Sequence, residues 1–397
     1  MWTASAGTIN SGGLLTAPPT AGTVTLTATS AQDTSKSGTA NVTVQAATPA
    51  PTITSVAVTC ASSTVVVSVS TQCSATVEGT GSYNSSVTWV ASAGTIDANG
   101  LLTAPALVGS VLVTAISVED PTKSSDATVT VQSRHVVVVM EENASYSTVV
   151  GDSNWPNLNA LISAGGLPTN YYADTHPSIG NYFMLTTGQI LTNNDNSVAI
   201  QTVDNIARRM LSYDVSFKIY AEGITQGYLG GNTGLYLIRH NPFAMISDVA
   251  DNSQVANQVI CPFSQFAIDL ANNALPDFSF IVPDVNDNVH NGTPQQADTW
   301  LQTRVVTPLS SYPAFAANGD GVLIVEFDES ITSDTQHGGG HVSPVLWGPI
   351  VKPGYMQTST TVYQHESMLR TMMEQLGLPD PPGAAATASS MAEFFVH

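Results

Sequence analysis

Lysine and arginine are scarce in this chain. Only ten occur among 397 residues, against thirty aspartates and glutamates, so the formal net charge is −20. The ten are scattered, and Arg208 and Arg209 form the only adjacent pair. Nucleic-acid binding depends on a basic surface that neutralises phosphates, and docking on anionic lipid depends on a basic cluster. The composition therefore excludes a nucleic-acid partner and disfavours an anionic membrane surface.

Long apolar runs are also missing. A membrane-spanning helix needs about 20 predominantly apolar residues, and no run approaches that length, so no transmembrane segment is predicted. The opening Met1-Trp2-Thr3 shows neither the basic nor the apolar region of a signal peptide. This absence has little weight, because the first residue falls inside a repeated unit.

The repeat occupies the first third of the chain. Two phrases recur at an offset of 87 residues, measured from Trp2 to Trp89. The repeated phrases are Thr3–Ile9 with Val90–Ile96, and Gly13–Pro18 with Gly100–Pro105. Short alternating segments rich in Val and Thr, separated by Gly, Pro and Ser, predict β-sandwich modules. Residues 47–132 are interpreted as a linker and a complete module. Residues 1–46 lack the opening strands, and are either truncated or completed from elsewhere.

These modules resemble the bacterial immunoglobulin-like domains found in tandem on secreted and surface proteins, and the resemblance covers residues 1–132. In this setting Cys60 and Cys73 are interpreted as a disulfide rather than two buried thiols, and Cys261 as a buried free thiol. A disulfide implies an oxidising compartment, so a secreted, cell-surface or periplasmic location is expected. The modules are candidates for contact with a cell surface or a polymer.

From residue 133 to residue 397 the pattern becomes that of an α/β domain. Three apolar runs are of the kind buried on both faces of a parallel sheet, namely His135–Met140, Pro276–Pro283 and Gly321–Phe327. Helical stretches such as Pro156–Ala164 and Thr299–Leu309 separate such runs. This alternation predicts a doubly wound α/β fold.

Polar residues follow each of these strands. Glu142 and Asn143 follow the first, Asp287–His290 the second, and Asp328 and Glu329 the third. One such group is commonly plain surface charge, but ligands of parallel sheets bind beyond the carboxyl ends of the strands. Three groups in one domain therefore favour a site. Carboxylate and amide oxygens suit a hard divalent ion.

The candidate nucleophile is Ser178, within the stretch Thr175–Asn181. The apolar run after Asn181 predicts a helix, so Ser178 would lie at a helix entry, where the dipole and free N–H groups favour an anion. Taken alone, the stretch could equally be a turn capped by Asn181. A bound cation would explain how the serine hydroxyl is activated.

A Ser-His-Asp triad is the alternative activation. The segment His176–Gly180 looks like a variant of the Gly-x-Ser-x-Gly elbow, and the order Ser178, Asp328, His365 fits an α/β-hydrolase. The phrase His337–Gly340 resembles a lipase oxyanion loop, but it follows the serine instead of preceding it. A metal-free esterase is therefore the less favoured hypothesis.

The domain resembles the bacterial phosphoesterases that group acid phosphatases with phospholipases C, in the alkaline phosphatase superfamily. The matching phrases keep the family's order across nearly all of residues 133–397. They are His135–Asn143, Thr175–Tyr182, Arg239–Phe243, Asp287–His290, Phe327–Glu329, Gly339–Val342 and Gln364–Arg370. The family usually has proline where Gly180 stands, so a looser turn is expected here.

The resemblance assigns a metal site. Glu142, Asn143, Asp328 and Glu329 would hold one divalent ion (Ca, Mg, Mn or Zn), with Ser178 as both ligand and nucleophile. The resemblance implies an alkaline-phosphatase-like doubly wound domain behind the immunoglobulin-like modules.

It also assigns substrate contacts. Asn181 would donate to a phosphate oxygen, and His240 and His290 would bind phosphate charge or protonate the leaving alcohol. His176 would either contact substrate or orient the loop. Two further histidines are less defined: His341 belongs to the metal site or to a turn, and His365 is expected to cap the helix that follows.

The expected function is a secreted, metal-dependent phosphoesterase. Ser178 would attack phosphorus, a phosphoserine would form, and water would hydrolyse it. An acid phosphatase is favoured over a phospholipase C, so the substrate is a small-molecule or lipid phosphate ester. Protonated histidines would offset the acidic chain, which favours an acid optimum. A non-catalytic surface adhesion or binding protein is the remaining alternative.

Overall fold

The structure is a computed structural model that describes residues 1–396, so His397, the last residue of the expected catalytic domain, lies outside it. The chain forms two compact units. One comprises Met1–Val58, Ala75–Thr88 and Ala115–Ser125, and the other comprises Thr59–Ser74, Trp89–Thr114 and the chain from Asp126 onward. The expected domain boundaries after residues 46 and 132 stay predictions. Within residues 1–396, no helix has the length and apolar character that crossing a membrane requires.

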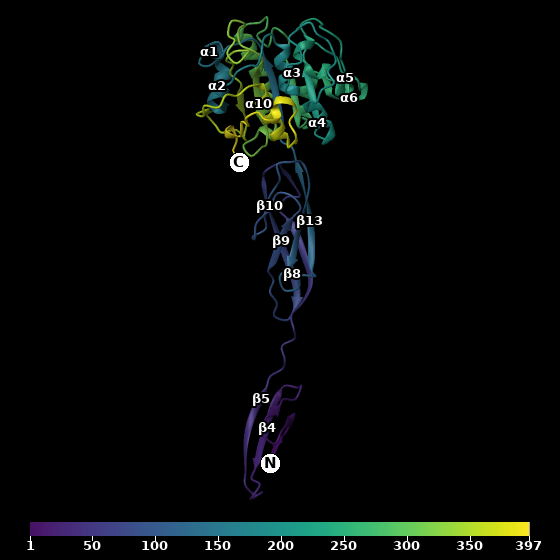
Figure 1. Ribbon diagram of the computed structural model, residues 1–397, viewed down its shortest axis with the longest axis vertical. Coiled ribbons are helices and arrows are strands. Elements are labelled where there is room, and N and C mark those ends of the chain that lie inside the picture. Colours follow the sequence, from purple (N-terminus) through teal and green to yellow (C-terminus); the bar gives the residue numbers. More distant parts are fainter. Residues whose placement is uncertain (397) are drawn as a thin grey trace. The chain divides into compact units, whose positions relative to one another are not determined.

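Residues 1–46 contain antiparallel strands only. A three-stranded sheet has the order β1-β4-β5, and β2 pairs with β3. The strands are β1 (Trp2–Ala4), β2 (Thr8–Ile9), β3 (Leu15–Thr16), β4 (Gly22–Thr29) and β5 (Ser37–Val44). β4 and β5 pair along their whole length (Figure 1). Their alternating Thr and Val residues have the composition that favours strands.

The next strands form two four-stranded sheets with the orders β10-β11-β8-β6 and β7-β13-β12-β9. They are β6 (Thr52–Cys60), β7 (Thr64–Val66), β8 (Ser70–Thr80), β9 (Val87–Ala91), β10 (Thr95–Ile96), β11 (Leu101–Thr103), β12 (Gly109–Ser117) and β13 (Ser124–Gln132). Side chains of both sheets share one apolar cluster, for example Leu102 with Val113 and Val129. The predicted disulfide between Cys60 and Cys73 is present. The immunoglobulin-like identity stays a prediction.

The α/β region is built on an eight-stranded sheet of order β17-β16-β18-β14-β19-β20-β15-β21. Its three central strands are parallel and fully buried: β14 (Val136–Glu141), β18 (Phe278–Val282) and β19 (Val322–Phe327). These are the three strands that the apolar runs predict. The others are β15 (Gly166–Leu167), β16 (Phe217–Ala221), β17 (Ile260–Pro262), β20 (Val345–Trp347) and β21 (Tyr355–Met356).

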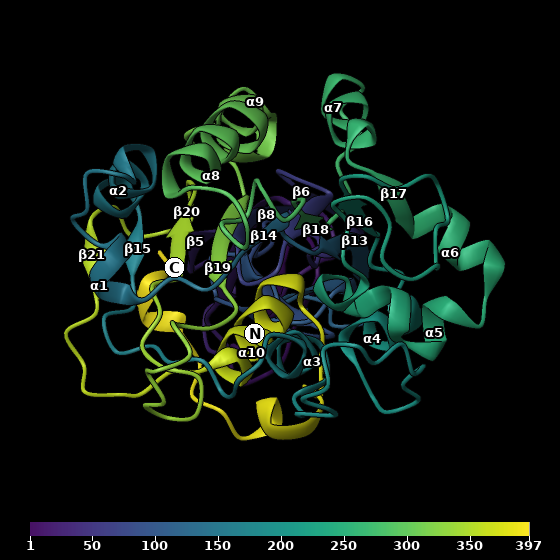
Figure 2. The ribbon, with the colours of Figure 1, turned by 90° about the horizontal axis from the view of Figure 1, so that it is seen from above.

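Helices cover both faces of this sheet, as a doubly wound fold requires (Figure 2). One face carries α2 (Pro156–Ala164), α7 (Ser264–Ala271), α8 (Pro294–Trp300) and α9 (Thr307–Ser310). The other carries α3 (Ile179–Thr187), α4 (Ile206–Ser212), α5 (Ser247–Ala250) and α10 (His365–Leu376). The remaining helices and helical turns are α1 (Tyr146–Val149), α6 (Ser253–Val259), η1 (Ile238–His240), η2 (Pro242–Met245), η3 (Leu301–Val306), η4 (Pro313–Phe315), η5 (Gly383–Ala386) and η6 (Ala392–Phe394).

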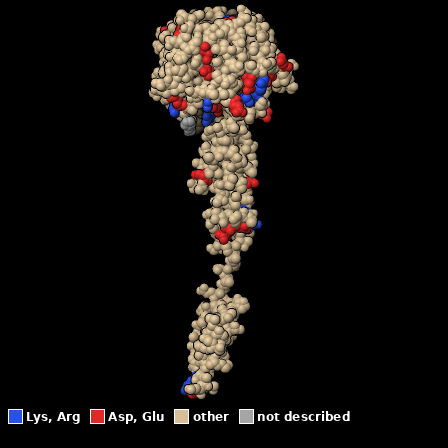
Figure 3. Space-filling model, in the orientation of Figure 1, with Lys and Arg blue, Asp and Glu red and all other residues tan. Residues whose placement is uncertain are grey.

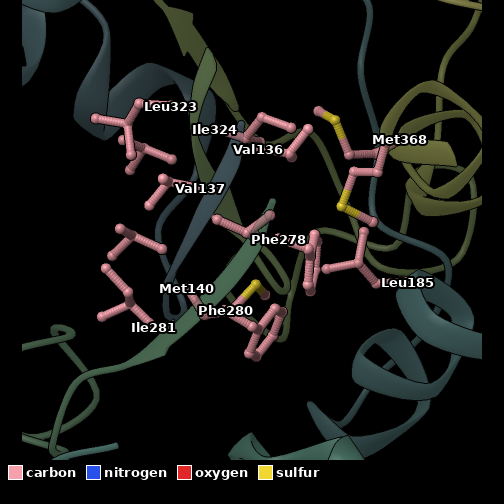
Figure 4. Close-up of a cluster of buried hydrophobic side chains, with 14 of the residues drawn as sticks. Val136, Val137, Met140, Leu185, Phe278, Phe280, Ile281, Leu323, Ile324 and Met368 are labelled. Carbon is pink, nitrogen blue, oxygen red and sulfur yellow. The ribbon is translucent and has the colours of Figure 1, made fainter. Parts of the chain in front are cut away.

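The apolar core fixes α3 against the central strands. Leu185 of α3 and Met368 of α10 lie beside Phe278 of β18 (Figure 4). Every residue of α3 is buried, and the helix ends at Gly188, whose φ of 68° is the left-handed conformation that glycine adopts most readily. Helix α3 is therefore held rigidly. Charged side chains are sparse on the visible face of the α/β region (Figure 3), in line with the 10% charged residues of the chain.

The free thiol is buried as expected. Cys261 lies in β17 and is the free cysteine among residues 1–396. Gln226 Nε2 donates to its sulfur over 3.3 Å. This thiol lies in the packed interior, so nothing links it to a site.

Candidate active site

Four polar residues meet where β14 and β19 end. The two strands are parallel neighbours with Glu141 opposite Phe327, so the residues that follow them leave the sheet together. The backbone N–H of Asn143 donates to Asp328 Oδ1 over 3.1 Å, and Asn143 Nδ2 donates to Glu142 Oε2 over 3.2 Å. Asn143 has a φ of 50°, a left-handed conformation that few side chains other than Asn and Asp tolerate. The structure thus gathers Glu142, Asn143, Asp328 and Glu329 in one place.

Ser178 lies beside this cluster, immediately before α3. Its side chain is buried, and its Oγ donates to Glu142 Oε2 over 3.2 Å. Burial raises the pKa of Asp328 and of Glu329, and hydrogen bonding to Ser178 opposes both shifts. The hydroxyl is therefore bonded to Glu142 and lies near Asp328 and Glu329. One turn into α3, Tyr182 donates its hydroxyl to Glu142 Oε1.

The three carboxyl groups are short of positive charge. Burial, and then the charge of Asp328, raises the pKa of Glu142 well above its usual range. The same two causes raise the pKa of Glu329 to about 9. Asp328 Oδ2 is buried and has no hydrogen-bond partner. A buried carboxylate is stabilised by a cation, and carboxylate, amide and hydroxyl oxygens suit a hard divalent metal. The residues present therefore fit the expected metal.

His240 and His290 approach the same cluster. His240 Nε2 lies 3.1 Å from Glu142 Oε1, but the alignment is too poor for a hydrogen bond, and this nitrogen has no partner. Glu142, His240 and His290 offer ligand atoms that all lie within 4.8 Å of one another. The imidazole nitrogens of His240 and His290 are therefore further candidate ligands for a cation bound at Glu142.

The protonation state of His240 differs from the expected one. Burial, followed by the charges of Arg239 and His290, holds the pKa of His240 well below its usual value. Its ring stacks on Tyr182 at 5.4 Å between centroids, in the interior of the protein. His240 is therefore neutral at neutral pH and can act on a phosphate as a hydrogen-bond donor, not as a cation.

Arg239 supplies the positive charge that the sequence analysis did not assign. Its Nη2 atom lies 2.8 Å from His290 Nε2, and its Nε lies 3.6 Å from Asp195 Oδ2. The Nε atom is buried and has no hydrogen-bond partner. The signal in the sequence was an arginine directly before a candidate histidine, in a chain with only ten basic residues.

The amide of Asn181 holds the loop that precedes Ser178. Its Oδ1 accepts hydrogen bonds from the N–H groups of Asp174 and Thr175 over 3.0 and 3.1 Å. Its Nδ2 donates to the carbonyl of Thr175 over 2.8 Å. All three bonds go to the backbone, because a side chain in the first turn of α3 reaches back over the loop. The structure therefore places Asn181 as a clamp on this loop, which differs from the expected phosphate contact.

His176 is also tied to protein groups. Its Nδ1 lies 2.8 Å from Glu329 Oε2, and its Nε2 lies 2.8 Å from the carbonyl oxygen of Asp334. This arrangement fits the alternative in which His176 orients the loop, because it links the loop to one of the carboxyl groups.

The space in front of Gly180 is closely filled by its neighbours. A Cβ atom built on Gly180 would lie 2.4 Å from Asn193 Oδ1 and 2.5 Å from Thr175 Cγ2. Asn193 itself donates to Thr175 Oγ1 over 2.9 Å. Neighbouring side chains therefore fill the space in front of the glycine and leave no room for a side chain there, while the expectation of a looser turn stays a prediction.

The structure holds two other histidines away from Ser178. His341 Nε2 donates to the carbonyl oxygen of Thr169 over 3.1 Å and its ring stacks on Tyr146, so it belongs to a turn. His365 is the first residue of α10, and its ring nitrogens lie 2.8 Å from Asp174 Oδ2 and 3.2 Å from Phe327 O. Both nitrogens of His365 are thus engaged elsewhere. The alternative triad of Ser178, Asp328 and His365 is not formed.

Comparison with known proteins gives consistent matches. The profile of the Phosphoesterase family matches residues 152–379. A phosphatidylinositol-3-phosphatase of Mycobacterium tuberculosis is 31% identical over 248 residues, covering 62% of this chain and 77% of that protein. A phosphate-repressible acid phosphatase of Penicillium chrysogenum is 29% identical over 248 residues, covering 60% of this chain. The chain spans only 58% of the length of that fungal relative.

Solved structures show a more distant likeness. A protein of the alkaline phosphatase superfamily from Vibrio parahaemolyticus is 15% identical, with a TM-score of 0.42 over 66% of this chain and 72% of that one. The family match, in contrast, extends over more than half of the present sequence. The chain belongs to the Phosphoesterase family and is a phosphoric ester hydrolase.

Proposed function

We propose that the chain is a metal-dependent phosphoesterase in which Ser178 attacks the phosphorus atom of the substrate. The observation that carries this proposal is the hydrogen bond of 3.2 Å from Ser178 Oγ to Glu142, a buried carboxyl group beside Asp328 and Glu329. A serine hydroxyl at a helix entry, directed into buried carboxyl groups whose ion-pair contacts among residues 1–396 are with histidines alone, is suited to activation by a bound metal.

The metal would be held by Glu142, Asn143, Asp328 and Glu329 together with Ser178. When bound, such an ion lowers the pKa of the serine hydroxyl and offsets the negative charge of the phosphate. The unpartnered Oδ2 of buried Asp328 supports this assignment. The oxygen ligands favour a hard ion, whereas the nearby nitrogen of His240 also suits a softer ion.

The chain's own residues would perform the remaining steps. Ser178 Oγ forms the bond to phosphorus while the alcohol leaves, and a phosphoserine results. Arg239 is the cation placed to attract the phosphate oxygens, and neutral His240 can donate to one of them. His290, beside Arg239, is the candidate to protonate the leaving alcohol. Water then attacks the phosphoserine and returns the hydroxyl to Ser178.

The substrate is proposed from the relatives. One of them is a phosphatidylinositol phosphatase and another an acid phosphatase, so both a lipid and a small-molecule phosphate monoester are in scope. A phosphomonoester hydrolase of acid phosphatase type is favoured over a phospholipase C. The disulfide between Cys60 and Cys73 supports a secreted or surface location, because such bonds persist in oxidising compartments.

The metal-free esterase has no such support. His365 faces Asp174 and the carbonyl of Phe327, so it is not placed as the base for Ser178 that a triad requires. A purely adhesive protein has no need of the buried carboxyl groups of Glu142, Asp328 and Glu329, so these groups favour a catalytic protein.

A phosphate-release assay tests the proposal. The purified chain is offered a chromogenic phosphomonoester, a phosphatidylinositol phosphate and a carboxylic ester, each with and without a chelator. Release of phosphate that stops with chelator and returns with added divalent metal is the expected result. Turnover of the carboxylic ester that survives chelation would support the esterase, and no turnover of any substrate would support a binding protein.

A further inference from the structure

Three further acidic side chains lie together at the edge of the sheet where its parallel strands end. Glu222 directly follows β16, and Asp284 and Asp287 follow the neighbouring strand β18. The two strands are parallel and in register at Ala221 and Val282, so their trailing residues meet. Ligand oxygens of Glu222, Asp284 and Asp287 all lie within 4.8 Å of one another.

A fully buried carboxyl group, that of Glu141, lies near enough to Asp287 for the charge of Asp287 to act on it, although Glu141 is outside the 4.8 Å group. Glu141, the last residue of β14, has no exposed surface, and neither of its oxygens has a hydrogen-bond partner. Its neighbour Glu142 accepts a hydrogen bond from Ser178, the residue that precedes α3. Successive strand residues point to opposite faces of a sheet. Glu141 therefore points to the face covered by α8 (Figure 2). Asp298 of α8 and Asp287 are the charges that act on it most strongly.

The partners of these groups are neutral donors. Glu222 accepts from Trp300 Nε1 and from the N–H of Asp284, each over 3.1 Å. Asp287 accepts from Gln296 Nε2 over 2.9 Å. Across the described chain, residues 1–396, none of the four carboxyl groups forms an ion pair with a lysine, arginine or histidine. Glu222, Asp284 and Asp287 are therefore crowded together, and neither they nor Glu141 have an ion-pair partner among residues 1–396.

We propose that Glu222, Asp284 and Asp287 form a second divalent cation site, distinct from the one at Ser178, with the buried carboxyl group of Glu141 beside it. The donors are carboxylate oxygens only, which selects a hard ion such as Ca²⁺ or Mg²⁺ over a thiolate- or imidazole-seeking metal. A cation there would also offset the charge of the nearby Glu141, whose buried oxygens have no hydrogen-bond partner.

This site shares a loop with the active site. The loop after β18 contains Asp284 and Asp287, which belong to the proposed second site. The same loop gives Asn288, whose carbonyl accepts from the N–H of Glu142 over 2.9 Å, and His290, which contacts Arg239. A cation at the second site holds the base of this loop, and so positions His290 without contacting the substrate.

Terbium luminescence gives a readout that is local to the proposed site. Tb³⁺ occupies hard-ion sites and is excited by a nearby tryptophan, and Trp300 donates directly to Glu222. Metal-stripped protein titrated with Tb³⁺ and excited through tryptophan should give a saturable signal that Trp300→Phe lowers strongly. Competition with Ca²⁺ and, separately, with Mg²⁺ identifies the preferred ion. A tryptophan-excited signal of unchanged size in Trp300→Phe, or no saturable signal in the wild-type protein, overturns the proposal.

Carboxamide variants test the ligands. The double variant Glu222→Gln, Asp287→Asn should weaken Tb³⁺ binding by roughly 100-fold or more, while Asp251→Asn, a change at an exposed residue, leaves it unchanged. Asp328→Asn, at the other site, should leave the Trp300-dependent signal in place. Melting in chelator checks the fold: the double variant should be at least as stable as wild type, since it removes repulsion. Ca²⁺ should then raise the melting temperature of the wild type more than that of the double variant. Wild-type Tb³⁺ affinity in a folded double variant contradicts the site.

Discussion

Ser178 and Glu142 are joined by a hydrogen bond of 3.2 Å that links the first turn of α3 to the end of β14. The other oxygen of Glu142 accepts from Tyr182, one turn further along the same helix. Glu142 is thus held by two side chains of one rigid element. Among residues 1–396 the serine hydroxyl is therefore oriented by a carboxyl group, which is the arrangement expected if a bound metal assists the nucleophile.

The metal ligands give the first prediction. Asp328→Asn should abolish phosphate release, because it removes a ligand oxygen and leaves the ion weakly held. In chelator its melting temperature should equal or exceed that of the wild type, because one buried repelling charge is gone. Asp251→Asn, at an exposed position, is the matched control. A variant that keeps full activity in metal, or a wild-type enzyme indifferent to chelator, would show that the ligand assignment is wrong.

Arg239 should matter for phosphate recognition. Arg239→Gln is expected to lower kcat/KM by about 100-fold, because a charge-assisted contact to phosphate is lost. Arg239→Lys should recover only part of the loss, since an ammonium group cannot reproduce the guanidinium fork. Steady-state kinetics on a phosphomonoester measures both. A glutamine variant within twofold of wild type would remove Arg239 from the site.

A variant of Asn181 can separate two roles of this residue, holding the loop before Ser178 and contacting phosphate. Three hydrogen bonds to the backbone of Asp174 and Thr175 would be lost in Asn181→Ala, so unfolding stability should drop by about 1–3 kcal/mol and kcat should fall. Denaturant melts and kinetics on the same preparations test this. An alanine variant with unchanged stability and a raised KM would instead indicate the direct phosphate contact that the family resemblance implies.

The stability of the metal-free protein should depend on pH. The raised pKa of Glu329, to about 9 by burial and Asp328, means that the folded state holds a proton that the unfolded state releases near its usual 4.5. The pKa of His365 is raised from 6.5 to about 9 because its hydrogen bond to Asp174 and its carboxylate neighbours outweigh the effect of burial. Both groups therefore contribute stability that is lost as pH rises through about 9.

The measurement is a set of denaturant melts in chelator across pH 6.5 to 9, where both of these shifts act in the same direction. Stability should fall steadily, and added metal should flatten the curve, because metal binding favours the ionised carboxyl groups. The low pKa of His240 acts in the opposite direction, but below pH 6.5. Chelated protein that becomes more stable over this range would contradict the buried cluster.

Apolar runs and strand ends were readable from the sequence because they follow from chain geometry. The strand positions of β14, β18 and β19 dictate that Glu142 and Asp328 leave the sheet together, and the structure places them so. The entry of α3 at Ser178 follows likewise from the apolar run after Asn181.

Side-chain direction was not readable in the same way. Asn181 turns back onto the loop, and His240 is buried against Tyr182, which lowers its pKa. Both outcomes depend on which neighbours the fold brings close. The role of Arg239 was missed for a related reason, since its contact with His290 joins loops 51 residues apart. Sequence spacing carries no information on such contacts.

The most direct test of the account is to trap the covalent intermediate. The wild-type enzyme, with metal and a phosphomonoester, is quenched in acid during turnover, where phosphoserine is stable, and its peptides are analysed by mass spectrometry. One added phosphate on Ser178 is the predicted result, with none in Ser178→Ala and a loss of several orders of magnitude in turnover for that variant. Phosphate on a different residue, no phosphoenzyme at any time during turnover, or near-normal turnover by Ser178→Ala would contradict the account.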